Sequence, residues 1–126
     1  WITTTADKSE GFTLSVRVRY NEAVTHGGID KAELVVTNGN QGSGSGRGPH
    51  SLEYASGSGT NELVFSLAIA ANNAATNADD VLTVAAQNIA KPGGATMKDT
   101  ADGTTNAAVA ISGAQGTACG SITVVA

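Results

Sequence analysis

The stretch LEYASGSGTNELVFSLAI, residues 52–69, decides the fold because it has the pattern of a β-hairpin. A strand turns successive side chains to opposite faces, so alternation of apolar and polar residues predicts one buried face. In the second arm the apolar side is formed by Leu63, Phe65, Leu67 and Ile69. The glycines of residues 56–61 can adopt the positive φ angles that a chain reversal requires. We therefore predict two antiparallel strands joined by this turn.

The same alternation recurs along the chain and predicts its architecture. Residues 12–20 form the cleanest strand, and shorter ones are expected over 1–5, 32–37, 81–85, 95–97, 107–111 and 121–125. Seven to nine short strands, separated by turn residues and unequal connections, favour an all-β, Ig-like antiparallel β-sandwich with Greek-key crossovers; an up-and-down barrel is the alternative. We expect residues 1–126 to form a single domain. The predicted core consists of Phe12, Leu14, Val16, Val18, Leu34, Tyr54, Leu63, Phe65, Leu67, Leu82, Val84, Val109 and Ile111.

Composition excludes several classes of partner. The net charge of −4 argues against nucleic acid or an anionic membrane surface. No apolar run approaches the roughly 20 residues that span a bilayer, so no membrane insertion is expected. The sequence starts at Trp1 without an initiator Met or a signal peptide, and we expect a processed product or a segment of a longer protein. Sparse charge and few aromatics are typical of an extracellular or particle-borne β domain.

Residues 38–49 contain five glycines and little that could pack in a core. Ordering so many glycines is entropically costly, so we expect a flexible glycine-rich loop. The segment lacks both the G-x-G-x-x-G spacing and the lysine of a phosphate-binding loop, so it does not indicate a nucleotide site.

Two segments carry a resemblance to a known family. Residues 18–24, Val-Arg-Tyr-Asn-Glu-Ala-Val, and residues 54–61, Tyr-Ala-Ser-Gly-Ser-Gly-Thr-Asn, resemble the strand end and the turn of Ig-like repeats in large bacterial surface proteins. Later matches are Asn77-Ala78-Asp79-Asp80, Leu82-Thr83-Val84, Ile89, residues 93–99 and Asn106-Ala107. The similarity covers about residues 12–111. Related Ig-like domains are appended to phage virion proteins.

The resemblance implies scaffolding, adhesion or spacing, and it supplies no catalytic residues. The long glycine-rich loop and the extra C-terminal strand over 121–125 depart from the repeat, and no second copy follows. These departures favour a stand-alone or terminal module. We expect a non-catalytic accessory module on a virion surface, where it attaches to proteins of a larger assembly. The alternative is an adhesin repeat at an extracellular bacterial cell surface, with a spacing or glycan-binding role.

Candidate catalytic residues are few. A nucleophilic site needs a Ser, Cys or Thr beside a histidine base and an orienting carboxylate. His26 and His50 lie near glycine-rich turns and Ser56 and Ser58 lie in one, but no G-x-S-x-G elbow is present. Cys119 lies in a run of small residues without a nearby cation, which predicts a buried or unreactive thiol. We therefore expect no enzyme activity.

Calcium is the inorganic ligand that the sequence leaves open, and no other cofactor is expected. Asp79, Asp80, Asp99 and Asp102 supply hard carboxylate oxygens in predicted loops. An EF-hand starting at Asp99 fails, because Ala101 and Gly103 occupy the next ligand positions. A site assembled from separate loops remains open, and the alternative is that these carboxylates cap turns.

Two further partner classes follow from the ends of the chain. Four of the five aromatics fall on inward sides of strands and only Trp1 is free, so stacking on a glycan is disfavoured, although polar loops can still bind sugars. The C-terminal strand alternates and carries no charge or proline, as a docking strand would. We expect it to close an edge of its own sheet or to pair with a neighbouring subunit, through Ser121, Ile122, Thr123, Val124 and Val125.

Overall fold

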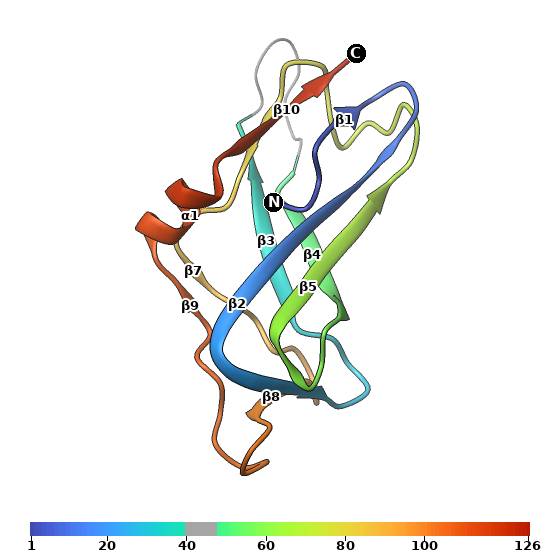
Figure 1. Cartoon of the computed structure of the whole chain (residues 1–126). Coiled ribbons are helices and arrows are strands. Elements are labelled where there is room, and N and C mark those ends of the chain that lie inside the picture. Colours follow the sequence, from blue (N-terminus) through green and yellow to red (C-terminus); the bar gives the residue numbers. More distant parts are fainter. Residues whose placement is uncertain (40–47) are drawn as a thin grey trace.

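The computed structural model describes residues 1–39 and 48–126, and strands dominate it (Figure 1). The fold is all-β and sandwich-like, with an eight-stranded curled sheet and a separate two-stranded sheet. The described residues hold ten strands, slightly more than the seven to nine expected, because several are only two residues long. They are β1 (Ala6–Asp7), β2 (Phe12–Gly27), β3 (Glu33–Asn38), β4 (His50–Ser56), β5 (Thr60–Ile69), β6 (Val81–Thr83), β7 (Gln87–Asn88), β8 (Thr96–Asp99), β9 (Ala110–Ile111) and β10 (Ser121–Val125).

The hairpin predicted from residues 52–69 is confirmed as β4 and β5. The two strands are antiparallel, and Tyr54 pairs with Phe65. Gly57 and Gly59 in the connecting turn have φ angles of 102° and 85°. A Cβ atom on Gly57 would collide with the carbonyl oxygen of Glu62, so glycine is required there for both backbone angle and space.

The strand order of the large sheet is β1-β10-β6-β3-β4-β5-β2-β8. Strands β3, β4 and β5 are consecutive and antiparallel, and β2, which precedes them in the chain, lies beside β5. Of the four strands β2 to β5, the fourth, β5, therefore returns beside the first, β2, and this arrangement defines a Greek key. The predicted Greek-key connection is therefore present, and β1 with β10 is a parallel pair in the sheet.

Strand β2 is longer than predicted and bends sharply (Figure 1). Its first part pairs with β5, the register shifts between Arg19 and Val24, and the last part, Val24–Gly27, pairs with β8. A bulge of this kind lets one strand turn a corner of a sandwich without ending. The polar residues after Tyr20, which resemble a strand terminus, form this corner.

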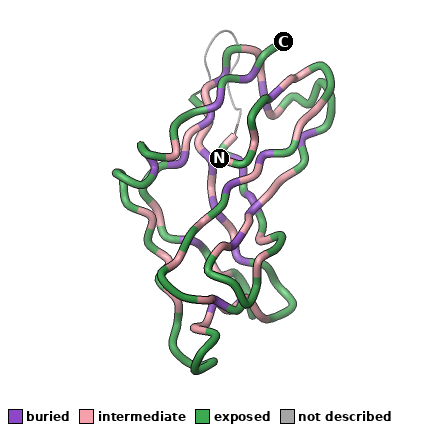
Figure 2. The backbone as a smooth tube through the Cα atoms, in the orientation of Figure 1, coloured by how far each residue is buried: buried purple, intermediate pink, exposed green. Residues whose placement is uncertain are grey.

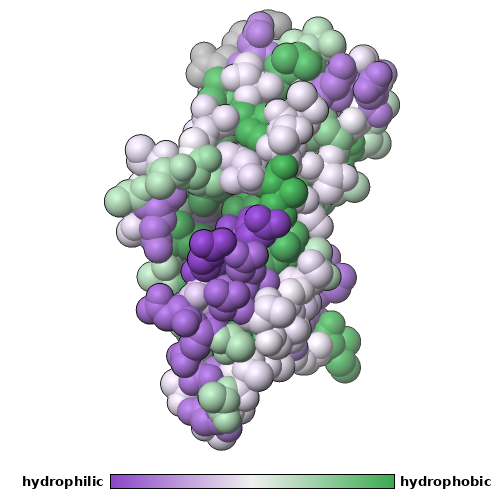
Figure 3. Space-filling view, in the orientation of Figure 1, coloured by the Kyte–Doolittle hydropathy of each residue, from purple (hydrophilic) through white to green (hydrophobic). Residues whose placement is uncertain are grey.

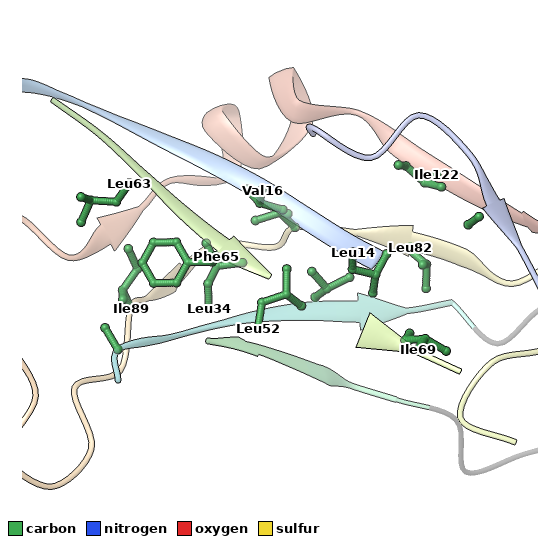
Figure 4. Close-up of a cluster of buried hydrophobic side chains, with 14 of the residues drawn as sticks. Leu14, Val16, Leu34, Leu52, Leu63, Phe65, Ile69, Leu82, Ile89 and Ile122 are labelled. Carbon is green, nitrogen blue, oxygen red and sulfur yellow. The ribbon is translucent and has the colours of Figure 1, made fainter. Parts of the chain in front are cut away.

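Burial alternates along the strands, and the buried positions converge on one interior (Figures 2 and 4). All thirteen residues of the predicted core belong to this hydrophobic cluster or pack against it. Seven are buried, whereas the remainder are half-buried at its margins: Phe12, Val18, Tyr54, Leu67, Val109 and Ile111. The cluster also includes residues outside the prediction, notably Val24, Ala32, Met97 and Val124.

Two terminal features differ from the expectations. Residues 1–5 do not form a strand; β1 begins at Ala6. A short helix, α1 (Gly113–Cys119), precedes β10 and begins with a capping box, in which Ser112 and Gln115 bond each other's backbone amides. No helix in the part of the chain that the structure describes is long and apolar enough to cross a membrane. The predicted flexible loop over residues 38–49 falls mainly on 40–47, which lie outside the described residues.

Candidate functional site

The predicted docking strand is β10, and its backbone is paired within the chain on both sides. Ser121, Ile122 and Thr123 pair with β6, while Val124 and Val125 pair with β1. Ile122 and Val124 are buried in the core. The sequence predicts that this strand either closes an edge of its own sheet or pairs with a neighbouring subunit, and in the structure it pairs within its own sheet. What it presents to solvent is an outer face of Ser121, Thr123 and Val125.

The carboxylates of Asp99 and Asp102 cap a turn after β8. Asp99 accepts a hydrogen bond from the amide of Ala101, at 2.8 Å. Asp102 accepts from the amides of Thr104 and Thr105 and from the Thr105 hydroxyl. These hydrogen bonds, led by the hydroxyl, lower the pKa of Asp102 to about 2. The local turn accounts for the position of both side chains.

The other candidate pair, Asp79 and Asp80, lies near the end of β10, away from the β8 turn (Figure 1). Asp80 is buried and accepts hydrogen bonds from the amide of Asn77 and from the side chain of Asn38. The structure does not bring the two pairs together into one site. Among residues 1–39 and 48–126 there is no group of three or more His, Cys, Asp or Glu side chains placed to hold a metal.

The contacts of the His26 ring leave it unable to act as a general base for Ser58. The imidazole stacks on Tyr54, with ring centroids 4.0 Å apart, and its Nε2 accepts a hydrogen bond from the amide of Ala32. Ser58 instead contacts the main chain of His26. Burial, helped by the charge of Lys31, lowers the pKa of His26. The ring therefore orders the turn that it contacts.

His50 is buried beside Asn38 and Asp80 at the start of β4. Its Nε2 lies 3.3 Å from the Asn38 side-chain nitrogen, and Asn38 also donates to Asp80. Burial lowers the pKa of His50, and the negative charge of Asp80 opposes this effect. One oxygen of Asp80, Oδ1, has no hydrogen-bond partner within the described residues. These side chains connect the end of β3, the start of β4 and the loop before β6.

Acidification should destabilise the fold through both histidines. A folded-state pKa below the unfolded value of about 6.5 means that the unfolded chain binds protons first. Each contribution to stability is therefore fully present above the unfolded-state pKa and is lost as the pH falls from neutral through the lowered folded-state pKa of the histidine. Thermal melts across this range test the prediction. The variants His26→Gln and His50→Gln should each lose less stability on acidification than the unmodified chain, and equal losses would contradict it.

A cleft of about 410 Å³ lies between β2 and β9. One wall is residues 16–21 of β2, and the other is residues 108–111, which include β9. Val84 and Ile89, both buried, lie at its base, and Cys119 of α1 lies at one end. In the space-filling view, apolar surface shows in the hollow between β2 and the α1 side, beside a hydrophilic cluster (Figure 3). We call this feature the β2–β9 cleft.

The cleft exists because the two strands that form its walls do not pair with each other. Among the described residues, strand β9 pairs with β7 alone, in the small sheet. Strand β2 pairs with β5 along one edge. Its other edge contacts Ile2 near the start of the strand and pairs with β8 at the end. Near the first end, the Ser15 carbonyl accepts from the amide of Ile2, at 2.9 Å. The backbone amide and carbonyl groups of successive residues point to alternate edges of a strand. Since those of Ser15 point away from β5, toward Ile2, those of Arg17 and Arg19 point to the same edge, which faces the cleft.

Two arginines lie on the outer face of β2 along the rim of the cleft. Arg17 and Arg19 share one carboxylate, Glu62 of β5, at 3.3 Å and 2.6 Å. Their side chains remain 50% and 74% exposed, so these ion pairs contribute little to stability. Two positive charges against one negative charge leave this rim locally basic, although the whole chain carries −4.

The surroundings of the cleft correct one expectation, which concerns Trp1. Trp1 is not a free aromatic platform, because it packs against the core and its indole nitrogen donates to the carbonyl of Gly120. Cys119 is half-buried and accepts a hydrogen bond from the terminal amine of Trp1. Tyr20 lines the other end; burial raises its pKa to about 12, and its hydroxyl has no partner in the described structure.

Sequence reasoning missed the cleft as a site. Of its lining residues, the sequence indicates chemistry only for Cys119, whereas five belong to the predicted core: Val16, Val18, Val84, Val109 and Ile111. The available signal was the Val-Arg-Val-Arg pattern of residues 16–19, which places two cations on the outward side of an apolar strand. That pattern does not show that the strand lacks a neighbour, since pairing depends on segments far away in the chain.

Comparisons with protein-family models, with curated protein sequences and with solved structures found no match to this chain.

Proposed function

We propose that this chain is a non-catalytic structural or accessory module that attaches to a protein partner within a larger assembly. The observation that carries the proposal is the edge of β2 that has no strand partner among the described residues, beside the partly apolar β2–β9 cleft. An exposed strand edge next to apolar surface is a template for pairing with another chain. A domain that keeps such an edge has use for it as an attachment surface.

The setting of this attachment comes from the sequence resemblance. An accessory domain on a virion surface fits the glycine-rich segment and the extra C-terminal strand, both of which depart from the repeat pattern. An adhesin repeat on a bacterial cell surface, with a spacing or glycan-binding role, is the alternative. A parent sequence with tandem copies at a period of about 100 residues would favour the adhesin. A capsid or tail protein as the bound partner would favour the virion.

The outer face of β10 offers a second contact surface. Val125 is 50% exposed, which makes it one of the few large apolar side chains exposed in the described structure. Ser121 and Thr123 lie on the same face. A partner can cover these side chains without displacing β1 or β6, so the C-terminal strand contributes through its face and not through its edge.

Photo-cross-linking in the source organism tests the attachment. A photoreactive amino acid replaces Ala110, which is exposed on the β9 wall of the cleft, and in a matched control it replaces Glu53, exposed on β4. We expect a discrete cross-linked protein from position 110 and none from position 53. Equal cross-linking from both positions, or none from either, would contradict attachment through the cleft.

A further inference from the structure

We propose that the β2–β9 cleft receives an extended strand of a partner protein, which pairs antiparallel with β2 and alternates apolar and acidic side chains. This inference rests on the proposed function as an attachment module and specifies the chemistry of the partner.

The open part of the β2 edge is a gap between two segments that already pair with that edge. At one end Ile2 bonds Ser15 and Thr3 bonds Thr13, so residues 2–3 run antiparallel to β2. At the other end β8 pairs antiparallel with Val24–Gly27. Only the stretch between them borders the cleft. An incoming strand with the same direction would make this edge continuous.

The length of the gap sets the length of the occupant. The β2 wall of the cleft comprises residues 16–21, and six residues of an extended chain span about 20 Å. The backbone groups of Arg17 and Arg19 would pair with the incoming strand. A segment of about six residues therefore matches the wall, and a folded domain would have to present it as an exposed strand or tail.

The interior of the cleft selects apolar side chains on one face of this strand. Val18, Tyr20, Val109 and Ile111 are half-buried around the cleft, above the buried Val84 and Ile89. Covering half-buried apolar surface is favourable at about 25 cal/mol per Å². Alternate residues of the occupant would fill this side, as side chains do in strand addition to a sheet edge.

The rim selects acidic side chains on the opposite face. Arg17 and Arg19 point outward from β2, and in the part of the chain that the structure describes both form their ion pairs with Glu62. Outward residues of a neighbouring strand lie beside them, where opposite charges are stabilising and like charges destabilising. The two arginines could instead serve to protect the strand edge from aggregation, as charged residues often do. In that role they would not favour an acidic peptide over a basic one, so the test compares the binding of an acidic and a basic peptide.

Peptide titration of the intact chain tests the proposal. The probe is the blocked hexapeptide Val-Glu-Val-Glu-Val-Thr, and its partner probe carries Lys in place of Glu. Amide hydrogen exchange and chemical shifts are followed by NMR. We expect saturable binding of the acidic peptide, with the amides of Arg17 and Arg19 becoming protected, and binding of the lysine peptide weaker by about tenfold or more.

Charge-reversal variants provide the matched control. Arg19→Glu removes a rim charge, and Lys31→Glu makes the same change at an exposed site away from the cleft. We expect Arg19→Glu to weaken the acidic peptide by about tenfold and Lys31→Glu to leave its binding unchanged. Equal binding of both peptides, equal effects of both variants, or protection of amides outside the β2 edge would overturn the proposal. So would a dimer of the chain alone with Arg17 and Arg19 already protected, because a second copy would then be the occupant.

The two experiments distinguish failure of this inference from failure of attachment itself. Cross-links from Ala110 with no peptide signal at Arg17 and Arg19 would leave attachment standing and overturn the acidic strand. Absence of both signals would overturn both proposals.

Discussion

Replacing Phe65 with alanine should lower the free energy of unfolding by about 3–5 kcal/mol. The ring is fully buried and lies in the middle of the core, near Leu34 and Ile89 (Figure 4). It also packs edge-on against Tyr54, with ring centroids 6.4 Å apart. Truncation removes the transfer free energy of the ring and leaves a cavity that neighbours on paired strands can fill only in part.

Urea unfolding of the variant, followed by fluorescence or circular dichroism, measures this loss. Val64→Ala is the matched control, because Val64 is the preceding residue of β5 and points to the opposite face, where it is half-buried. We expect it to cost less than about 1.5 kcal/mol. A larger cost at Val64 than at Phe65 would show that the faces of β5 are assigned the wrong way round.

The strand faces could be predicted because side-chain alternation is a local property. The inward set of β5, and the inward set of β2 as far as Tyr20, follow from period-two hydrophobicity alone. The hairpin turn is equally local, since Gly57 adopts a backbone conformation that few other residues tolerate. The buried or half-buried state of all thirteen predicted core residues follows from these two signals.

Strand ends and partners were harder to predict because they depend on distant segments. Asn21 and Glu22 resemble the end of a strand, yet β2 continues through a bulge because β8, far along the chain, pairs with its last residues. Strands β1 and β7 are two residues long, which is too short for any periodic pattern, and β9 covers only the last two residues of the strand predicted over 107–111. The short helix α1 was missed because its small residues resemble a loop, although Ser112 and Gln115 form a capping box.

The candidate site shows the same division. Turn-capping by Asp99 and Asp102 could be anticipated from residue type, because aspartate side chains accept from nearby backbone amides. The β2–β9 cleft could not, since an open edge is a property of how the sheet closes. The arginines on its rim were visible in the sequence, but their significance depends on the missing neighbour strand.

The position of β10 leads to the other prediction of a large effect: deleting residues 120–126 should unfold the domain. The deletion removes Val124, which is fully buried, and Ile122, which is nearly so. Burying two such side chains contributes about 3–6 kcal/mol. The deletion also breaks the pairing with β6 and β1, exposing backbone groups of both strands at once. A domain of this size has about 5–15 kcal/mol of stability in total, so the combined loss approaches the whole.

Circular dichroism and amide hydrogen exchange of the truncated chain would measure the outcome. We expect loss of the cooperative melting transition and of exchange protection in β6. Thr123→Ala is the control, because it alters the outward face of β10 while keeping both pairings, and it should change stability by less than about 1 kcal/mol. A truncated chain that melts cooperatively, with β6 still protected, would show that β10 is an addition to a complete sandwich. In that case its edge would return as an interface, and the β2–β9 cleft would be one of two places where this domain accepts a strand.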